Sequence, residues 1–368
     1  ARGSANVAIV GKPVLDFTSY ANLYQSCASQ SASVASAPGL AFVDATIAAS
    51  RCASLHAKGQ LASTTTAAQA DEALQKLRDY GWEPESSILH ASLAAFEVAP
   101  AVTVTFANAA ARAKVSDNLC GFSFAATSAA DNTVVALDPN ALLDLYGTGN
   151  GIPPTGDATV ANGVVQIVNN LDPAGPRRSL RSASPSTGAF DANLDGALCL
   201  RDLVTGTGAT AQAVQAGIGE TRVTGRMNGK PVLIVHGRAD ALIPVNHTSR
   251  PYAALEHHVD GSASQLSYIE VTNAQHFDSF IGLTTLLPGY DTRFVPLHLY
   301  LMRALDAMYD HLKNGTPLPP SQVVRTTPRG GTAGQAPAIA ASNVPAIASA
   351  PAAGDAISYT AAGITVPD

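Results

Sequence analysis

GKPVLIVHGRADALIP, at residues 229–244, is the stretch that decides the fold of this 368-residue chain. Within it, residues 232–235 are a continuous run of Val, Leu and Ile that begins after Pro231 and ends at His236. Such a run predicts a strand buried on both faces, as in a parallel sheet. A polar loop that contains Asp240 follows the predicted strand.

The pattern continues as alternating helices and strands. Residues 246–258 predict a helix with an amino-terminal cap at Asn246 or Thr248, and residues 266–271 predict a second strand. A long helix is expected over about 294–312, because apolar side chains recur there at helical spacing. Strand, helix, strand, helix is the order of a doubly wound α/β sheet.

Asp240 is the first residue whose position indicates chemistry. It lies in the loop at the carboxyl end of the first predicted strand, the edge of an open α/β sheet where functional groups gather. A carboxylate there can accept the proton on one ring nitrogen of a histidine and stabilise the imidazolium that forms in catalysis. The alternative is an Asp that only caps its loop, since Asp is common in turns. The surrounding HGxxDxxIP pattern favours the catalytic interpretation.

His276 has the matching position after the second predicted strand. In α/β-hydrolases the acid and then the histidine follow late strands of the sheet in that chain order. We therefore predict a direct hydrogen bond between Asp240 and His276, about 2.6–3.2 Å between heavy atoms. Six other histidines lie on predicted elements or beside charges, and we assign them no catalytic role: His236, His247, His257, His258, His298 and His311.

The third member of a catalytic triad, a serine in a GxSxG turn, is not evident. GFSFA at 121–125 lacks the second glycine, and GSASQ at 261–265 lies between the acid and the histidine, which is the wrong order. No cysteine lies at such a turn either. We therefore expect the chain to begin after the segment that carries the nucleophile.

These observations predict an α/β fold of the α/β-hydrolase type. The chain would hold only the last two strands of the doubly wound sheet, with a large, mainly helical lid inserted before them. We expect four divisions: short strands in 1–20, the lid in 21–225, the carboxyl-terminal part of the core in 226–327, and a Gly-, Ala- and Pro-rich tail packed on the body in 328–368.

A strand buried on both faces needs a neighbour on each edge, and an unpaired edge favours aggregation. The sequence offers only 266–271 as a neighbour for 232–235. We therefore expect that the chain does not fold stably alone. It should bury well above ~2,000 Å² against an amino-terminal segment or companion chain that carries the serine.

Composition excludes several other classes of protein. Hydrophobic residues make up 46% of the chain, which excludes a disordered protein, and the formal net charge of −6 argues against nucleic acid as a partner. No run of 18 or more apolar residues occurs, so we predict no membrane span. No Cys or Cys/His cluster has zinc spacing, and we expect neither a metal nor a cofactor.

The four cysteines, Cys27, Cys52, Cys120 and Cys199, allow three pairings, and spacing alone does not choose among them. Their even number, in a chain poor in charge, is typical of an exported protein with two disulfides, extracellular or periplasmic. Four buried thiols in a cytoplasmic protein are the alternative. We predict Cys27–Cys52, which closes a short loop, and Cys120–Cys199, which joins two segments that flank the loop-rich middle of the lid.

Several long motifs resemble one enzyme family. GKPVLIVHGRADALIPVNHTSRPY at 229–252, NAQHFDSFIG at 273–282 and PGYDTRFVPLHLY at 288–300 are similar to the D-(−)-3-hydroxybutyrate oligomer hydrolases. The resemblance extends over nearly the whole chain, from GKPVLDFTSYANLYQSCA at 11–28 to RTTPRGGTAG at 325–334.

The resemblance implies a serine esterase that cleaves short, soluble 3-hydroxybutyrate oligomers in polyhydroxybutyrate degradation. It also implies that Asp240 and His276 are the acid and the histidine and that the serine lies in an amino-terminal half. Two alternatives stay open: a hydrolase of another ester, such as a feruloyl or tannase-like substrate, and a non-catalytic binding subunit that lacks the nucleophile.

Overall fold

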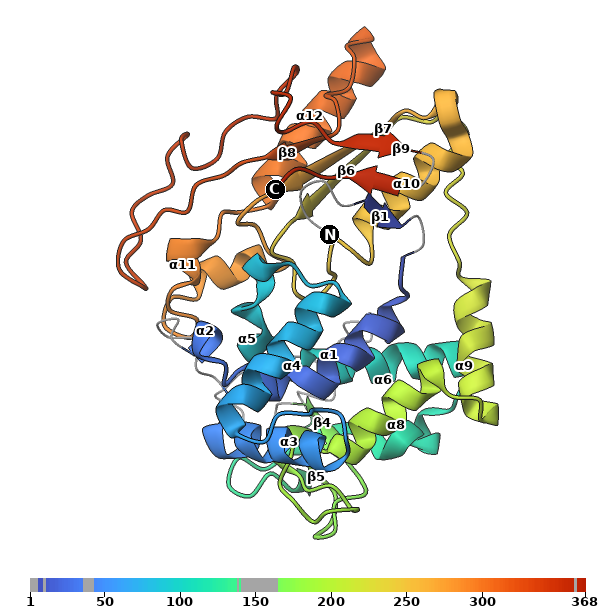
Figure 1. Ribbon diagram of the computed structural model, residues 1–368, viewed down its shortest axis with the longest axis vertical. Coiled ribbons are helices and arrows are strands. Elements are labelled where there is room, and N and C mark those ends of the chain that lie inside the picture. The colour runs from blue at the N-terminus through green and yellow to red at the C-terminus, as the bar shows by residue number, and fades with distance from the viewer. Residues whose placement is uncertain (1–5, 9–10, 36–42, 138, 140–164, 361–362) are drawn as a thin grey trace.

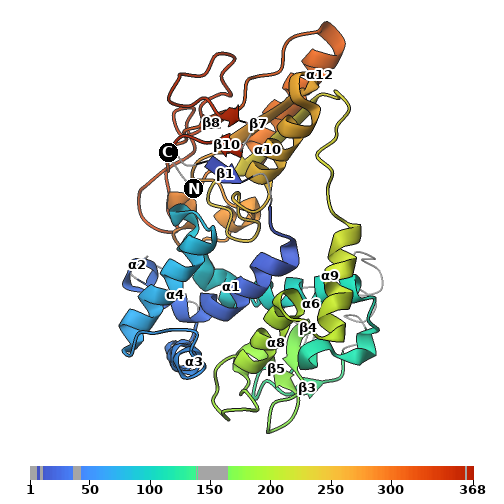
Figure 2. The same ribbon diagram turned by 45° about the vertical axis from the view of Figure 1, so that its right-hand side comes forward.

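The computed structural model describes residues 6–8, 11–35, 43–137, 139, 165–360 and 363–368. Helices of the amino-terminal part occupy the lower half of Figure 1, and a small parallel sheet with its covering helices occupies the upper half. In Figure 2 the segment that follows α9 runs from the lower half up towards the sheet. The molecule is therefore a mixed α/β protein, and most of its helices precede the parallel sheet in the sequence.

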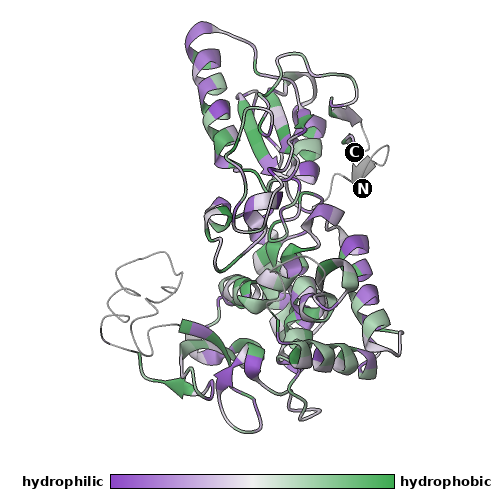
Figure 3. Cartoon of the chain, turned by 90° about the vertical axis from the view of Figure 1, so that its left-hand side faces the viewer, coloured by the Kyte–Doolittle hydropathy of each residue, from purple (hydrophilic) through white to green (hydrophobic). Residues whose placement is uncertain are grey.

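The parallel sheet begins with a strand from the stretch 229–244. Its order is β6 (Val232–Gly237), β7 (Leu266–Val271) and β8 (Gln322–Val324), and all three strands run parallel. Every residue of β7 is buried, whereas β6 lies at the edge of the sheet and is only partly buried. In Figure 3 these strands are among the most hydrophobic parts of the upper half.

One sequence-based prediction about this sheet is wrong. Among the described strands β6 pairs only with β7, the single neighbour that the sequence offered, and it is only partly buried in this chain. The strands near 231 and 266, however, are not the last ones, since β8 follows and pairs with the far side of β7. A strand of three residues gives no periodic signal in the sequence.

Helices cover the two faces of the sheet. On one face α10 (Ser249–Asp260) packs with Tyr268 of β7, and on the other α12 (His298–Asn314) packs with Ile269 and Val271 through Tyr300. The short α11 (Tyr290–Arg293) precedes α12, which begins four residues later than the expected start at 294.

The carboxyl-terminal tail packs on this body. β9 (Ser358–Thr360) and β10 (Gly363–Thr365) form an antiparallel sheet with β1 (Asn6–Ala8), in the order β1-β10-β9. Ile364 and Val344 are buried, and they join the clusters on opposite faces of the parallel sheet.

The amino-terminal part is largely helical. Its helices are α1 (Val14–Ala28), α2 (Ala32–Ala35), α3 (Ala45–Ala57), α4 (Thr66–Tyr80), α5 (Leu89–Ala95), α6 (Val98–Ala111), α8 (Leu194–Thr205) and α9 (Ala209–Glu220). An antiparallel sheet that the sequence did not predict lies among them, in the order β3 (Val134–Val135), β2 (Phe122–Thr127), β4 (Val165–Asn169) and β5 (Arg177–Arg178).

Of residues 1–20, the structure describes 6–8 and 11–20. Asn6–Ala8 is a short strand, as expected, but α1 already begins at Val14. Of the helices described, none is by itself long and apolar enough to span a membrane. α5 and α6 are long and apolar enough only when they are taken together, and a bend of 63° separates them.

Candidate active site

The parallel pairing of β6 with β7 brings two loops together at one edge of the sheet. β6 ends at Gly237 and β7 at Val271, and these two residues are partners in the register. The loop after β6 carries Asp240 and the loop after β7 carries His276. Residues that follow aligned ends of parallel strands meet at the same edge, so the register itself brings these side chains into reach.

Asp240 and His276 form the hydrogen bond that the sequence predicted. His276 Nδ1 donates to Asp240 Oδ2 at 2.9 Å. The other nitrogen, Nε2, makes no hydrogen bond with any residue that the structure describes. A carboxylate that holds Nδ1 sets the tautomer and leaves Nε2 to exchange a proton with a substrate or a nucleophile.

Asp240 is held by its own loop as well. Its side chain is 3% exposed, and Oδ1 accepts hydrogen bonds from the backbone N–H groups of Leu242 at 2.9 Å and Ile243 at 2.7 Å. Asp240 therefore caps its loop and holds His276 at the same time. Burial opposes the charged form, but hydrogen bonds and charge from His236 and His276 outweigh it and lower the pKa of Asp240 to about 2.

His276 lies at the surface of the site, with its side chain 31% exposed. Burial alone would lower its pKa, but the hydrogen bond from Nδ1 to Asp240 and the negative charge there raise it above its ordinary value. The ring packs edge-on against Phe277 with centroids 4.6 Å apart, and Phe277 stacks on Phe280. An aromatic pair therefore adjoins the imidazole.

The sequence missed a second histidine on the same carboxylate. His236 Nε2 donates to Asp240 Oδ2 at 3.2 Å, and His236 Nδ1 lies 2.6 Å from Ser249 Oγ. His236 is the penultimate residue of β6, four positions before Asp240. The HGxxD spacing is visible in the sequence. It does not show, however, that the side chain of His236 turns towards Asp240.

Ser249 is a serine in contact with a histidine of this site, but its position does not suit a nucleophile. Its hydroxyl contacts His236 and Tyr268 at 2.6 and 3.0 Å, and the residue is only 7% exposed. It begins α10 after a loop rather than at the turn from a strand into a helix. A buried hydroxyl that bonds to structural partners has no access to an ester, so Ser249 belongs to the network that supports Asp240.

The two stretches rejected from the sequence, 121–125 and 261–265, also lie away from His276 in the topology. Ser123 is in β2, in the antiparallel sheet, where Asn170 Nδ2 donates to its hydroxyl at 2.9 Å. Ser262 lies in the turn Gly261–Ala263 before β7, at the opposite end of that strand from His276.

A buried ionic network fixes the base of the site. Glu270 of β7 accepts two hydrogen bonds from Arg250, from Nε at 2.8 Å and from Nη2 at 2.6 Å, and a third from Arg238. All three side chains are essentially inaccessible, as the exposures of 0–1% show. Burial opposes ionisation of Glu270, but the two arginines outweigh it and lower its pKa to about 2.

The same network ties the helical part to the acid loop. Glu83 accepts hydrogen bonds from Arg250 Nη1 at 2.6 Å and from Asn246 Nδ2 at 2.9 Å. Its neighbour Trp82 is buried and donates from Nε1 to the carbonyl of Ala241, directly after Asp240, at 2.8 Å. Residues 82–83 of the helical part are therefore anchored beside Asp240.

Both predicted disulfides are present in the structure. Cys27 of α1 is bonded to Cys52 of α3, and Cys120 is bonded to Cys199 of α8. Across the described residues, no group of three or more His, Cys, Asp or Glu side chains could hold a metal ion.

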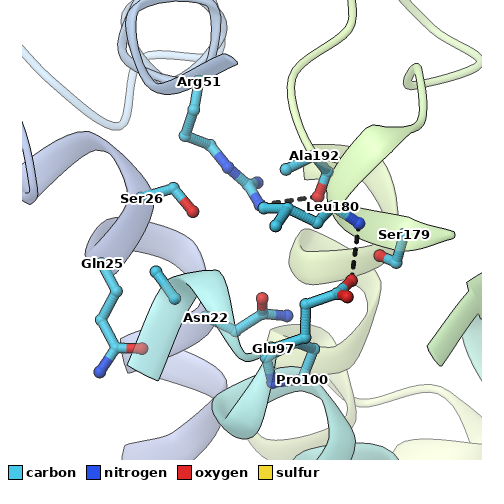
Figure 4. Close-up of a pocket in the computed structure, with 10 residues that line it drawn as sticks. Asn22, Gln25, Ser26, Arg51, Glu97, Pro100, Ser179, Leu180 and Ala192 are labelled. Carbon is cyan, nitrogen blue, oxygen red and sulfur yellow. Dashed lines mark hydrogen bonds between the residues drawn. The ribbon is translucent and has the colours of Figure 1, made fainter. Parts of the chain in front are cut away.

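Two hollows differ sharply in what they could hold. A polar cavity among Arg51, Glu97 and Asn22 in the helical part has a volume of about 20 Å³, room for about one water molecule and not for an ester (Figure 4). A groove of about 620 Å³ between β6 and α12 reaches His276. Only the second has space for a larger group next to the candidate histidine.

A family model described as 3HB-oligomer hydrolase matches residues 1–368. The chain belongs to this family. Three relatives of this 3HB-oligomer hydrolase family member, each named D-(−)-3-hydroxybutyrate oligomer hydrolase, are 59% identical (Paracidovorax citrulli), 58% identical (Ralstonia pickettii) and 51% identical (Azoarcus sp.).

The alignments cover 100% of this chain but only 52%, 50% and 51% of those relatives. The chain thus spans about half the length of the curated relatives that it matches. No solved structure matches it.

Proposed function

We propose that this chain is part of a serine esterase that hydrolyses ester bonds in short oligomers of D-(−)-3-hydroxybutyrate. The observation that carries the proposal is the hydrogen bond from His276 Nδ1 to the buried Asp240 at the carboxyl edge of a parallel sheet. The names of the relatives support the substrate class. The serine is supplied by a segment outside these 368 residues.

In each half-reaction of this mechanism, His276 first accepts a proton and then donates it. The serine Oγ bonds to the ester carbonyl carbon while its proton passes to His276 Nε2, and Asp240 stabilises the imidazolium. The bond to the alcohol oxygen then breaks, and His276 returns the proton to that oxygen. Water repeats the sequence on the acyl-enzyme and releases the acid and the serine.

The fold belongs to the same proposal. Residues 226–327 form the carboxyl-terminal part of an α/β-hydrolase core, and residues 21–225 form the lid over its active edge. The anchoring of Trp82 to Ala241 and of Glu83 to Arg250 supports a lid fixed beside the acid loop. The two disulfides favour an exported enzyme, extracellular or periplasmic.

A chimaera tests the proposal in a full-length protein. In it, this chain replaces the matched 375 residues of the Paracidovorax citrulli relative. The chimaera should release 3-hydroxybutyrate from its dimer and trimer. His276→Ala should lower kcat/KM by on the order of 10⁴-fold, whereas His258→Ala, an exposed histidine of α10, should leave it unchanged.

The outcomes separate the competing functions. Full activity of the His276→Ala variant would contradict the assignment of this histidine. A folded chimaera that binds the trimer without cleaving it would favour a binding subunit. Cleavage of aromatic esters in preference to the trimer would favour another esterase.

A further inference from the structure

The edge of the parallel sheet next to His276 is open. Among the described strands β6 pairs with β7 alone, and β7 and β8 continue the sheet only on the other side. The N–H of Val232 donates to Gln265, and the N–H of Arg238 donates to Val271. Because residues of a parallel strand alternate between their two neighbours, the even-numbered amides face β7. The N–H and C=O groups of Leu233 and Val235 therefore point away from it, along the open edge.

The helix beside this edge presents an apolar stripe to the outside. Leu301, Leu305 and Leu312 of α12 are 52%, 53% and 69% exposed, and they lie at helical spacing on one side. The only buried residues of α12 are Tyr300 and Ala304. An apolar stripe at helical spacing normally faces a core, but nothing in the described part of the chain covers this one.

The open edge and the stripe are one continuous surface. Leu233, Val235, Leu301, Leu305 and Met308 line the same groove of about 620 Å³, and His276 stands at it. An unpaired strand edge next to exposed leucines is a template for another polypeptide. What covers this surface therefore also gains access to the exposed side of His276.

We propose that this surface, β6 with the outer stripe of α12, is where the half of the relatives that is absent here docks. That half adds a strand parallel to β6 and covers the leucines of α12. The occupant follows from length, since the matched stretch is 52% of the Paracidovorax citrulli relative and leaves 48% of it unmatched. The proposal shares one premise with the proposed function, that the serine-bearing segment lies outside this chain.

A second copy of the chain fits the surface less well. Two copies related by a twofold axis present the same strand to each other, and such strands pair antiparallel. The sheet on the other side of β6 is parallel throughout. A segment of the same polypeptide can add a parallel strand through a crossover connection, which continues the arrangement already present.

Hydrogen–deuterium exchange in the chimaera tests the pairing at single amides. The amides of Ile234 and His236 face β7 and serve as internal controls for a paired strand. The amides of Leu233 and Val235 should exchange as slowly as these controls, by a factor of at least ~10³ below an unprotected amide. Fast exchange at 233 and 235 beside slow exchange at 234 and 236 would overturn the proposal, as would protection that appears only when the chimaera dimerises.

Charged substitutions test the helix stripe in the same protein. Leu301→Glu with Leu305→Glu should lower the equilibrium constant of folding by on the order of 100-fold, because both side chains are covered in the chimaera. Leu171→Glu is the matched control, since Leu171 is 57% exposed and lies after β4 in the other half of the molecule. An unchanged folding constant for the double variant would overturn the proposal.

These readouts do not depend on hydrolysis. Protected amides at 233 and 235 in an inactive chimaera would uphold the docking surface and contradict the proposed function. An active chimaera with fast exchange at both amides would do the reverse. If the double variant fails to fold, the exchange measurement on the unsubstituted chimaera still decides the proposal.

Discussion

Two histidines, His236 and His276, form hydrogen bonds with the carboxylate of Asp240. They differ in what their other ring nitrogen contacts. Nδ1 of His236 is engaged by the buried Ser249, whereas Nε2 of His276 is bonded to no described residue and its ring is partly exposed. Of these two histidines we therefore propose His276 as the one that exchanges protons with a substrate. His236 is a positioning residue, because its hydrogen bond helps to fix the orientation of Asp240.

Replacing His236 should consequently weaken catalysis without abolishing it. In the chimaera, His236→Ala should lower kcat by about 10–100-fold with little change in KM, a loss typical of outer hydrogen-bond partners. His236→Gln, which keeps a donor, should recover part of that loss. A loss as large as that of His276→Ala would contradict the positioning role.

The pH profile of kcat/KM reports on His276 directly. A general base works as the neutral imidazole, so activity is full above its pKa and falls as the pH drops through it. Because Asp240 raises the pKa of His276, the acidic limb should lie above the ordinary value of about 6.5. In Asp240→Asn the residual activity should show that limb at lower pH. An acidic limb that does not move would mean that the two groups are uncoupled.

For single residues, the sequence predicted positions that follow from the order of strands along the chain. Asp240 and His276 could be predicted because each follows a recognisable strand, and parallel strands end at one edge. The roles of His236 and Ser249 could not be predicted, because they depend on side-chain directions at a strand end and a helix start.

At the scale of elements, strands with β-branched runs were predicted well. The strand expected at 266–271 has those bounds. The strand expected at 232–235 begins where predicted and ends two residues later, at Gly237. β8 was missed because a strand of three residues gives no periodic signal. β6 is less buried in this chain than its run of Val, Leu and Ile suggests, because β7 is its one neighbour among the described strands.

The contact between the helical part and α10 can be tested through one ion pair. Glu83→Gln leaves Arg250 without one of its two carboxylate partners in a buried site, so the free energy of unfolding of the chimaera should fall by about 3 kcal/mol. Urea denaturation measures this change. Glu220→Gln is the control, because its pair with Arg112 is exposed and should contribute less than about 1 kcal/mol. Equal effects of the two variants would contradict a buried anchor at Glu83.

At the scale of the whole molecule, the disulfides hold the helical part together. They close separations of 25 and 79 residues, for which the chain-entropy relation gives about 3.5 and 4.5 kcal/mol. Non-reducing peptide mapping should recover Cys27 with Cys52 and Cys120 with Cys199, and reduction should lower the melting temperature. Four alkylatable thiols in the denatured, unreduced protein would contradict both bridges and the case for export.

The architecture could be predicted only in part at this scale. The helical character of the amino-terminal part follows from its alanine-rich sequence, but the antiparallel sheet β3-β2-β4-β5 has short, weakly patterned strands. The packing of the tail depends on contacts with distant residues, such as the hydrogen bond from Arg238 to Pro367, which local composition does not encode.

In the proposed enzyme, His276 and Asp240 activate a serine that lies outside these 368 residues. Labelling the chimaera with a fluorophosphonate, followed by peptide mass spectrometry, tests it most directly, because the probe bonds covalently to an activated serine. We predict one labelled serine in the part contributed by the Paracidovorax citrulli relative, with labelling lost in His276→Ala and kept in His258→Ala. A labelled serine within residues 1–368, or labelling that His276→Ala leaves unchanged, would contradict the account.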